Sequence, residues 1–420
     1  MKDKTKAIHE GYIKDIQKTM AVPIYMSTAY EYESVEHAAD LFALRDVGNI
    51  YTRISNPTTD VFEKRIASLE GGVAALATAS GMSAIFYSLV NVAKAGDNIV
   101  ASAKLYGGSV TLLTHTLKRF GIEAKFFDPH KPEEIEKLID KNTKAILFES
   151  ISNPSIDVAD IEGICNIADK YEIISICDNT VATPSLFKPI DYGCDVVVHS
   201  ASKYITGQGL AIGGVLIESQ KAGKKIEDNE RYLVFNEPDE SYHGLVFTKT
   251  SFPPFSLRAR LSLLRDMGAV LSPFNSWLFI QGLETLDIRM REHSKNAFLI
   301  AKFLNSHPKV KKVHYPCLKS DENYPFAMKY LKKGCSGLLS FEVESFKEAK
   351  KIVDNVEIFS IVTNIGDSKS IITHPASTTH QQLSKKELAA AGVAEGLIRL
   401  SVGLEDSADL IEDLKKAIEA

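Results

Sequence analysis

Two side chains with complementary chemistry follow two successive apolar runs of the sequence. Asp178 ends the run Ile173–Asp178, and Lys203 comes shortly after the run Val196–Ser200. A lysine amine can form an imine with an aldehyde cofactor, and a carboxylate can keep a pyridine nitrogen protonated so that the ring accepts electrons. Taken alone, this pair is more simply explained as a turn-capping aspartate and one solvated lysine among many. Whether Asp178 and Lys203 bind such a cofactor therefore depends on further residues that suit the same cofactor.

A second set of residues could bind a phosphate group. The segment Ser80-Gly81-Met82 stands where a strand-like run, Ala74–Ala77, passes into an apolar helical pattern. Small residues at a helix start leave backbone N–H groups free for an anion, which the helix dipole also attracts. Ser200 and Ser202 flank the lysine and could donate hydroxyl hydrogen bonds to the same phosphate. Taken alone, the first segment is explained by ordinary helix capping.

Alternating apolar and amphipathic segments predict which elements position these side chains. Alternation of this kind is typical of a largely parallel sheet covered on both faces, and ligands bind beyond the carboxyl ends of its strands. We therefore expect Asp178, Lys203 and Tyr106 to lie at one edge, where Tyr106 could stack on a flat ring or act as an acid-base group, although a turn tyrosine usually only packs. The predicted strands are Asn98–Ser102, Glu123–Phe127, Ala145–Glu149, Ile173–Asp178 and Val196–Ser200, and the predicted helices are Ser109–Arg119, Pro132–Leu138 and Ile161–Tyr171.

Changes in pattern along the chain predict three parts. Residues 1–57 form an arm with little periodicity, residues 58–256 the large domain, and residues 257–420 a small C-terminal domain. Long helical periodicity from Leu257 to Leu304, then a strand at Gly337–Val343 and a helix from Phe346, make the last part a smaller α+β lobe. An arm without its own core needs a surface to pack on.

Composition and charge exclude several classes of function. The chain has 420 residues, 45% of them hydrophobic, so it can bury a sizeable core. Lysine and arginine total 49 against 54 acidic residues, and the net charge of -5 offers no footprint for a nucleic-acid backbone. The longest apolar stretch, Ala74–Ala93, is interrupted by polar residues and is predicted as a buried helix. We expect a soluble cytoplasmic protein that acts on a small molecule and does not bind a membrane.

The cysteines give no sign of a metal site or of disulfide bonds. An odd and scattered set without a CxxC pair argues against a disulfide framework and against zinc. We expect all five to be buried apolar side chains. They are Cys165, Cys177, Cys194, Cys317 and Cys335.

Three motifs taken together resemble the pyridoxal 5′-phosphate (PLP)-dependent Cys/Met metabolism family, the trans-sulfuration enzymes of PLP fold type I. These are Ser200-Ala-Ser-Lys-Tyr204, Asp178-Asn-Thr180 and Tyr51-Thr-Arg-Ile-Ser-Asn-Pro57. The similarity runs from about Pro23 to Glu405. The resemblance implies an α/β, aspartate aminotransferase-like large domain with a mostly parallel sheet, an N-terminal arm and a smaller α+β domain. Further shared segments are Glu149-Ser-Ile-Ser-Asn-Pro154, Gly282-Leu-Glu-Thr285 and Arg399-Leu-Ser-Val-Gly-Leu-Glu-Asp406.

The same resemblance implies a role for each candidate site residue. Lys203 holds PLP as a Schiff base and serves as the catalytic base, Asp178 binds the pyridinium nitrogen, and Tyr106 stacks on the ring. Arg399 clamps the substrate carboxylate with help from Asn364, although the arginine alone suggests a surface ion pair. The remaining implied cofactor contacts are Asn153 at the phenolic oxygen, then Ser80, Gly81, Met82, Ser200 and Ser202 at the phosphate, with Tyr51 and Arg53 reaching it from a neighbouring subunit.

Within the family, three stretches most resemble the O-acetylhomoserine sulfhydrylase branch. This implies γ-replacement on O-acetyl-L-homoserine with sulfide or methanethiol, by a homodimer at least and a homotetramer as the expected assembly. The stretches are Glu237-Pro-Asp-Glu-Ser-Tyr-His-Gly244, Leu271-Ser-Pro-Phe-Asn275 and Ile371-Ile-Thr-His-Pro-Ala-Ser-Thr-Thr379, and Thr363-Asn-Ile-Gly-Asp367 agrees with them.

Two departures and two kinds of alternative remain. Gly108 stands where methionine γ-lyases carry a cysteine, which counts against that activity, and Cys335 stands where a glycine is common. Methionine γ-lyase and cystathionine γ-synthase are the alternatives within the family. A Rossmann nucleotide binder or a non-catalytic small-molecule binding protein is the alternative outside it, although no GxGxxG turn follows a first strand.

Overall fold

The large domain is built on a seven-stranded sheet that is parallel except for one strand. The computed structural model describes residues 1–378, 381 and 393–420. The strand order is β1-β7-β6-β5-β4-β2-β3, and β7 runs antiparallel to both of its neighbours. The mostly parallel sheet expected from the sequence is thereby confirmed. Its strands are β1 (Ala74–Thr78), β2 (Asn98–Ser102), β3 (Glu123–Phe127), β4 (Thr143–Glu149), β5 (Ile174–Asp178), β6 (Val196–Ser200) and β7 (Gly214–Glu218).

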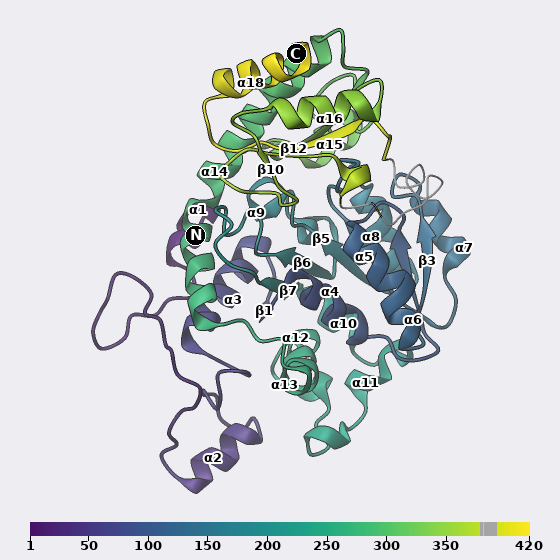
Figure 1. The fold of residues 1–420 in the computed structure, drawn as a ribbon. Helices are drawn as coiled ribbons and strands as arrows, with labels where there is room; N and C mark the ends of the chain where they lie inside the picture. Colours follow the sequence, from purple (N-terminus) through teal and green to yellow (C-terminus); the bar gives the residue numbers. More distant parts are fainter. Residues whose placement is uncertain (379–380, 382–392) are drawn as a thin grey trace.

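Apolar side chains alternate between the two faces of this sheet, and each face is covered by helices (Figure 1). In β4, Ile146 and Phe148 belong to one buried cluster, and Ala145 and Leu147 belong to the other. Both faces of the inner strands exclude water, which explains why these strands are nearly continuous apolar runs, whereas the edge strand β3 is partly exposed. The first cluster includes side chains of α3 (Pro57–Glu70), α8 (Ile161–Lys170) and α14 (Pro273–Ser306), and the second includes α4 (Gly81–Val90) and α12 (Pro254–Arg258).

Two predicted helices are present but are not uniform. The segment Ser109–Arg119 is covered by α5 (Gly107–Thr111), the π-helical η1 (Leu112–Thr116) and α6 (Leu117–Arg119), and Pro132–Leu138 divides into η2 (Pro132–Glu134) and α7 (Ile135–Leu138). The stretch Ala74–Ala93, predicted as a buried helix, is helical only in α4 (Gly81–Val90). Its first residues form β1, which pairs with β7, as the strand-like run Ala74–Ala77 predicted.

The small domain carries a five-stranded sheet of order β10-β11-β12-β9-β8. The long helix α14 connects it to the large domain, where the helix packs against α3 (Figure 1). The expected α+β lobe is present, and Thr379, the last residue of one motif above, lies outside the described residues. The elements are β8 (Lys312–His314), α15 (Tyr324–Tyr330), β9 (Leu338–Glu342), α16 (Phe346–Asn355), β10 (Ser360–Ile361), β11 (Ile371–Thr373), β12 (Leu397–Ser401) and α18 (Ser407–Glu419).

The predicted periodicity from Leu257 to Leu304 contains a break. Helix α12 is followed by η7 (Ala259–Leu264) and α13 (Arg265–Met267), which ends at Gly268 with a φ of 76°, and α14 begins at Pro273. Arg260 on η7 donates to the Ile54 carbonyl oxygen and pairs with Glu63 at 2.6 Å. The predicted boundary after residue 256 stays a prediction.

The arm leaves the large domain and carries two short helices. Helix α1 (Asp3–His9) packs against α3 and α14, whereas α2 (Val35–Phe42) lies well away from the sheet (Figure 1). Several large apolar side chains of the arm are at least 73% exposed, which is unusual for the surface of a soluble monomer. These are Ile13, Ile16, Met20, Met26, Val35 and Val47.

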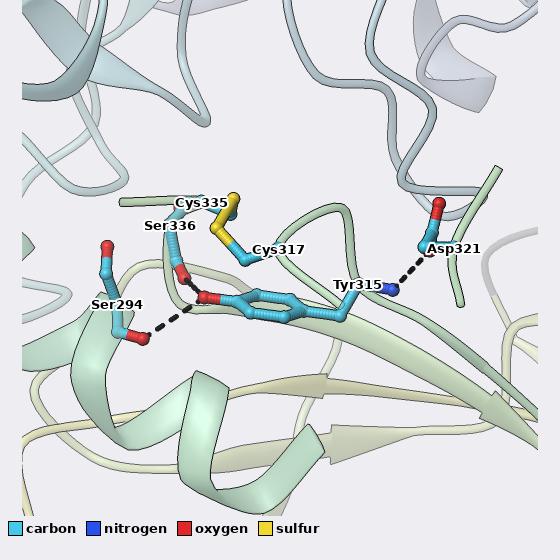
Figure 2. Close-up of a disulfide and its surroundings, with 6 residues drawn as sticks. All are labelled: Ser294, Tyr315, Cys317, Asp321, Cys335 and Ser336. Atoms are coloured by element: carbon cyan, nitrogen blue, oxygen red, sulfur yellow. Dashed lines mark hydrogen bonds between the residues drawn. A yellow bond between two sulfur atoms is a disulfide. The ribbon is translucent and has the colours of Figure 1, made fainter. Parts of the chain in front are cut away.

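Two cysteines depart from the expectation that all five are unpaired. Cys165, Cys177 and Cys194 are free and buried, as predicted. Cys317 and Cys335 form a disulfide with their Cα atoms 5.9 Å apart (Figure 2). The prediction is wrong for this pair because the antiparallel pairing of β8 with β9 brings together the segments that flank these strands. Sequence spacing does not show such proximity.

The disulfide lies in a tightly bonded corner of the small domain. Figure 2 shows the Tyr315 ring beside it, with the hydroxyl 3.1 Å from the Ser294 carbonyl oxygen and 3.0 Å from that of Ser336. The Ser336 hydroxyl donates to the Val181 carbonyl oxygen at 2.8 Å, which ties this corner to the large domain. Cys335 therefore has a structural partner in place of the glycine that is common there. Among the described residues, no helix is long and apolar enough to cross a membrane.

Candidate active site

A cavity of about 500 Å³ lies at the carboxyl edge of the seven-stranded sheet, between the two domains. Most of the predicted site residues line it, from elements that are far apart in the sequence. Tyr51 and Arg53 are not among the described residues that line the cavity of their own chain. The predicted residues that the structure brings together are Ser80, Gly81, Met82, Tyr106, Asn153, Asp178, Ser200, Ser202, Lys203, Asn364 and Arg399.

Lys203 lies in the turn that follows β6, with its amine in the cavity. The Nζ atom donates to Asn364 Oδ1 at 2.6 Å. Burial lowers the pKa of Lys203 below its ordinary value, and the positive charge of Arg399 lowers it further. A lysine with a lowered pKa is more often neutral, and only the neutral amine is a nucleophile or a base.

Asp178 ends β5 and is held by the residue two places after it. Its Oδ1 atom accepts the Thr180 N–H at 2.9 Å and the Thr180 hydroxyl at 2.6 Å. The Thr180 Oγ1 atom in turn accepts the Ser200 N–H at 2.8 Å. Burial raises the pKa of Asp178, while the Thr180 bonds and His199 oppose that rise. Thr180 is not among the site residues predicted from the sequence, although its spacing from the aspartate is that of a side-chain turn.

The residues expected at a phosphate surround the start of α4. Ser80 caps this helix by accepting the Ser83 N–H at 3.1 Å. A Cβ atom on Gly81 would lie 2.6 Å from the Ser200 Cβ atom, so only glycine allows β6 to approach this closely. Ser202 is engaged elsewhere, since its hydroxyl donates to the Gly213 carbonyl oxygen at 3.1 Å. The start of this ten-residue helix thus lines the cavity, and a helix start is a favourable place for an anion.

Tyr106 stands at the cavity wall with 44% of its surface exposed. A Cβ atom on Gly108 would lie 2.5 Å from the Tyr106 Cε1 atom. Any side chain at position 108 would therefore displace the ring. Gly108, which stands where methionine γ-lyases carry a cysteine, therefore leaves the Tyr106 ring in place.

Arg399 on β12 is only 3% exposed, so it is not the surface residue that its type alone suggests. Its Nη1 donates to Asn153 Oδ1 and its Nη2 to the Asn364 carbonyl oxygen, each at 3.0 Å. Among the described residues, the buried Nε has no hydrogen-bond partner. Burial lowers the pKa of Arg399 to about 10. A guanidinium held by neutral oxygens, with a donor to spare, suits an incoming carboxylate.

Tyr51 and Arg53 remain at the base of the arm. The Arg53 guanidinium lies 5.5 Å from the centre of the Tyr51 ring, and it donates to the Arg265 carbonyl oxygen. Tyr51 is 42% exposed. Both side chains, Tyr51 and Arg53, are thus exposed to solvent on the surface of this chain.

The cavity suits PLP by the chemistry of its groups. It offers the Lys203 amine of lowered pKa for an aldehyde, the Asp178 carboxylate, which accepts from neutral donors, and a helix start for a phosphate. Lys203, Asp178 and Ser80–Met82 would hold the three parts of such a cofactor.

Comparisons with known proteins agree with this fit. The model of the Cys/Met metabolism PLP-dependent enzyme family matches residues 4–419. The O-acetyl-L-homoserine sulfhydrylase of Leptospira meyeri is 46% identical, over 99% of this chain and 96% of its own length. The homocysteine synthase of Schizosaccharomyces pombe is 44% identical, over 99% and 97% respectively.

A solved structure is similar over the whole length of both chains. It is described as an O-acetylhomoserine (thiol)-lyase of Campylobacter jejuni, is 53% identical, and superposes with a TM-score of 0.99. In that structure a lysine carries a covalently attached pyridoxyl 5′-monophosphate. The expected PLP fold type I is confirmed by this similarity.

Proposed function

The chain belongs to the Cys/Met metabolism PLP-dependent enzyme family, and from that premise we propose that it catalyses γ-replacement on O-acetyl-L-homoserine. Sulfide, or methanethiol, replaces the acetate, and the products are homocysteine, or methionine, and acetate. The relatives at 44–46% identity over 99% of the chain support this substrate and the place of the enzyme in methionine biosynthesis. PLP is the cofactor.

One observation carries the proposal. Lys203, Asp178 and Arg399 converge on one cavity from β6, β5 and β12, and each is bonded there by neutral groups. These are the base, the ring-nitrogen partner and the carboxylate clamp that amino-acid chemistry on PLP requires. A non-catalytic binding protein has no use for a lysine of lowered pKa beside a buried arginine.

The residues divide the work of the reaction. When bound, PLP supplies an aldehyde that links to an amine and a ring that accepts the electron pair left by a departing α-proton. Arg399 binds the substrate carboxylate, and Lys203 Nζ takes the proton from the α-carbon and moves protons at the neighbouring carbons. Asp178 holds the proton on the ring nitrogen, and Tyr106 covers the ring face.

We also propose that two subunits share each site. Tyr51 and Arg53 are exposed at the base of an arm whose apolar side chains are uncovered, so a second copy is the natural surface for the arm. In that assembly both residues bind the phosphate in the partner's cavity. A homodimer is then the smallest active unit, and a homotetramer and a cytoplasmic location stay predictions.

A product assay tests the proposed activity. Purified enzyme is given O-acetylhomoserine, O-succinylhomoserine or methionine, each with and without sulfide, and the products are separated. We expect homocysteine and acetate from O-acetylhomoserine with sulfide, and little turnover otherwise. Methanethiol and 2-oxobutyrate from methionine alone would identify a methionine γ-lyase instead, and a colourless protein without turnover would contradict any PLP enzyme.

A further inference from the structure

Glu149 is a buried carboxyl at the cavity to which none of the roles above is assigned. It ends β4, is 6% exposed and lines the cavity. The strand order places β4 between β5 and β2, so Glu149 stands between Asp178 and the loop that carries Tyr106. Its own backbone is in register with Asp178. Glu149 therefore lies between the two groups that are proposed to contact the cofactor ring, Asp178 and Tyr106.

The bonds of this carboxyl go to backbone groups of cofactor-facing residues. Glu149 Oε1 accepts the Tyr106 N–H at 2.7 Å, and the Asn153 N–H also interacts with the carboxyl. Tyr106 is the N-cap residue of α5, and its own side chain makes no capping hydrogen bond to that helix. The loop after β2 and the loop after β4 are therefore joined through one side chain.

We propose that Glu149 is a positioning residue, which fixes the ring-stacking Tyr106 and the loop of Asn153 against the cofactor by accepting their backbone N–H groups. This inference rests on the proposed function of the cavity. It requires an oxygen acceptor at the end of a three-carbon side chain and does not require a negative charge. Asp178, directly beside it, would repel a second charge.

The electrostatics agree with a neutral acid at this position. Burial raises the pKa of Glu149 well above its usual value, and the neighbouring Asp178 carboxylate raises it further. Asp178 is the better place for the charge, because the Thr180 hydroxyl and N–H both donate to it. Glutamine, which is the neutral isostere, should therefore replace Glu149 at little cost.

Glu218 provides a matched control. It is also a fully buried glutamate, and its carboxyl accepts the N–H groups of Phe255 at 3.2 Å and Ser256 at 2.8 Å. It ends β7, the antiparallel strand, and therefore lies at the opposite edge of the sheet. Glu218→Ala removes the same kind of bonds without touching the cavity.

The first measurement needs no cofactor, so its failure is distinct from a failure of the proposed function. Amide hydrogen exchange of the loop that contains Tyr106 is followed in the apoprotein. We expect faster exchange in Glu149→Ala and in the length-preserving Glu149→Met, and wild-type exchange in Glu149→Gln and Glu218→Ala. Unchanged exchange in both Glu149→Ala and Glu149→Met would overturn the proposal.

The second measurement is the affinity of each apoprotein for PLP, together with the visible circular dichroism of the bound cofactor. Loss of these bonds should weaken PLP binding roughly 10-fold in Glu149→Ala and Glu149→Met and reduce the dichroic band. Glu149→Gln should stay within about 3-fold of wild type. If Glu149→Gln fails as badly as Glu149→Ala, or if Glu218→Ala weakens PLP binding equally, the positioning role is wrong. Should Glu149→Ala not fold, Glu149→Met and Glu149→Gln make the same comparison.

Discussion

At the amino edge of the seven-stranded sheet, two lysines are each paired with an aspartate. Lys225 lies 2.5 Å from Asp195, and Lys144 lies 3.7 Å from Asp97. At the carboxyl edge, within the part of the chain that the structure describes, Lys203, Asp178 and Arg399 form no ion pair and are bonded by neutral groups.

This difference between the two edges indicates that their charged side chains serve different purposes, stability at the amino edge and function at the carboxyl edge. Paired charges at the amino edge offset each other's desolvation cost, whereas buried charges without a counter-charge cost free energy when no ligand is bound. That cost is recovered when a ligand brings the opposite charges, and the groups are then already oriented. Charges at the carboxyl edge should therefore affect catalysis, and charges at the amino edge should affect stability.

The largest effect is expected from Lys203→Ala. The change removes both the covalent link to the cofactor and the group that moves protons, so turnover should fall at least about 10³-fold. The protein should still fold, because the substitution removes a buried amine that has no counter-charge among the described residues. Homocysteine formation and the thermal midpoint are measured, with a borohydride-reduced peptide map to locate PLP in the wild type. Retention of more than a few percent of the activity would refute the assignment.

Asp178→Asn should come next. A neutral amide cannot hold the ring nitrogen protonated, so kcat should fall about 10²- to 10³-fold while PLP still binds. Stopped-flow absorbance after substrate addition reports the slow step directly. Near-normal rates would mean that Asp178 only caps the turn that it forms with Thr180.

Arg399→Leu tests the unpaired guanidinium in two ways. KM for O-acetylhomoserine should rise about 10²-fold, because the substrate carboxylate loses its partner. The pKa of Lys203 should also rise, since burial and Arg399 both hold it down. At a given pH less of the amine is then neutral, so Schiff-base formation between the apoprotein and PLP should shift to higher pH.

Arg399→Lys is the matched control for that variant. It keeps the positive charge but lacks the planar fork, so KM should rise while the pH profile of Schiff-base formation stays close to wild type. An unshifted profile in Arg399→Leu would show that the arginine does not influence the lysine.

A smaller effect tests whether a neighbouring subunit completes the carboxyl edge. Co-expression of Arg53→Ala with Lys203→Ala should restore activity to roughly a quarter of wild type, because half of the dimers are mixed and half of their sites are intact. If Arg53 served the cofactor of its own subunit, every site would carry one defect, and activity would not exceed the sum of the parents.

The smallest effect on activity is expected at the amino edge. Lys225→Met leaves Asp195 buried without its cation, which should lower the free energy of unfolding by about 3 to 5 kcal/mol. The kinetic constants should stay within about 2-fold of wild type, because the pair lies at the far edge from the cavity. Denaturant midpoints and steady-state rates are compared. A large loss of kcat without loss of stability would break the contrast between the two edges.

Local sequence pattern determined the sheet and most of the cavity. β2 and β6 begin and end where the apolar runs predict, because a strand buried on both faces is apolar along its whole length. β3, at the edge of the sheet, also has the predicted bounds, although it is partly exposed. Asp178 and Lys203 follow such strands, and parallel strands end at one edge, so their proximity could be inferred. The family motifs supplied further lining residues, Arg399 and Asn364 among them.

Contacts between distant segments were decided by the tertiary structure alone. Arg399 looks like a surface residue until β12 buries it against Asn153, 246 positions away in the chain. Cys317 and Cys335 look unpaired until β8 and β9 align, and Glu149 is one strand-end acid until its carboxyl meets the Tyr106 N–H. Periodicity records which face of an element is buried, but a hydrogen bond or a disulfide depends on distances that are set only when whole elements pack.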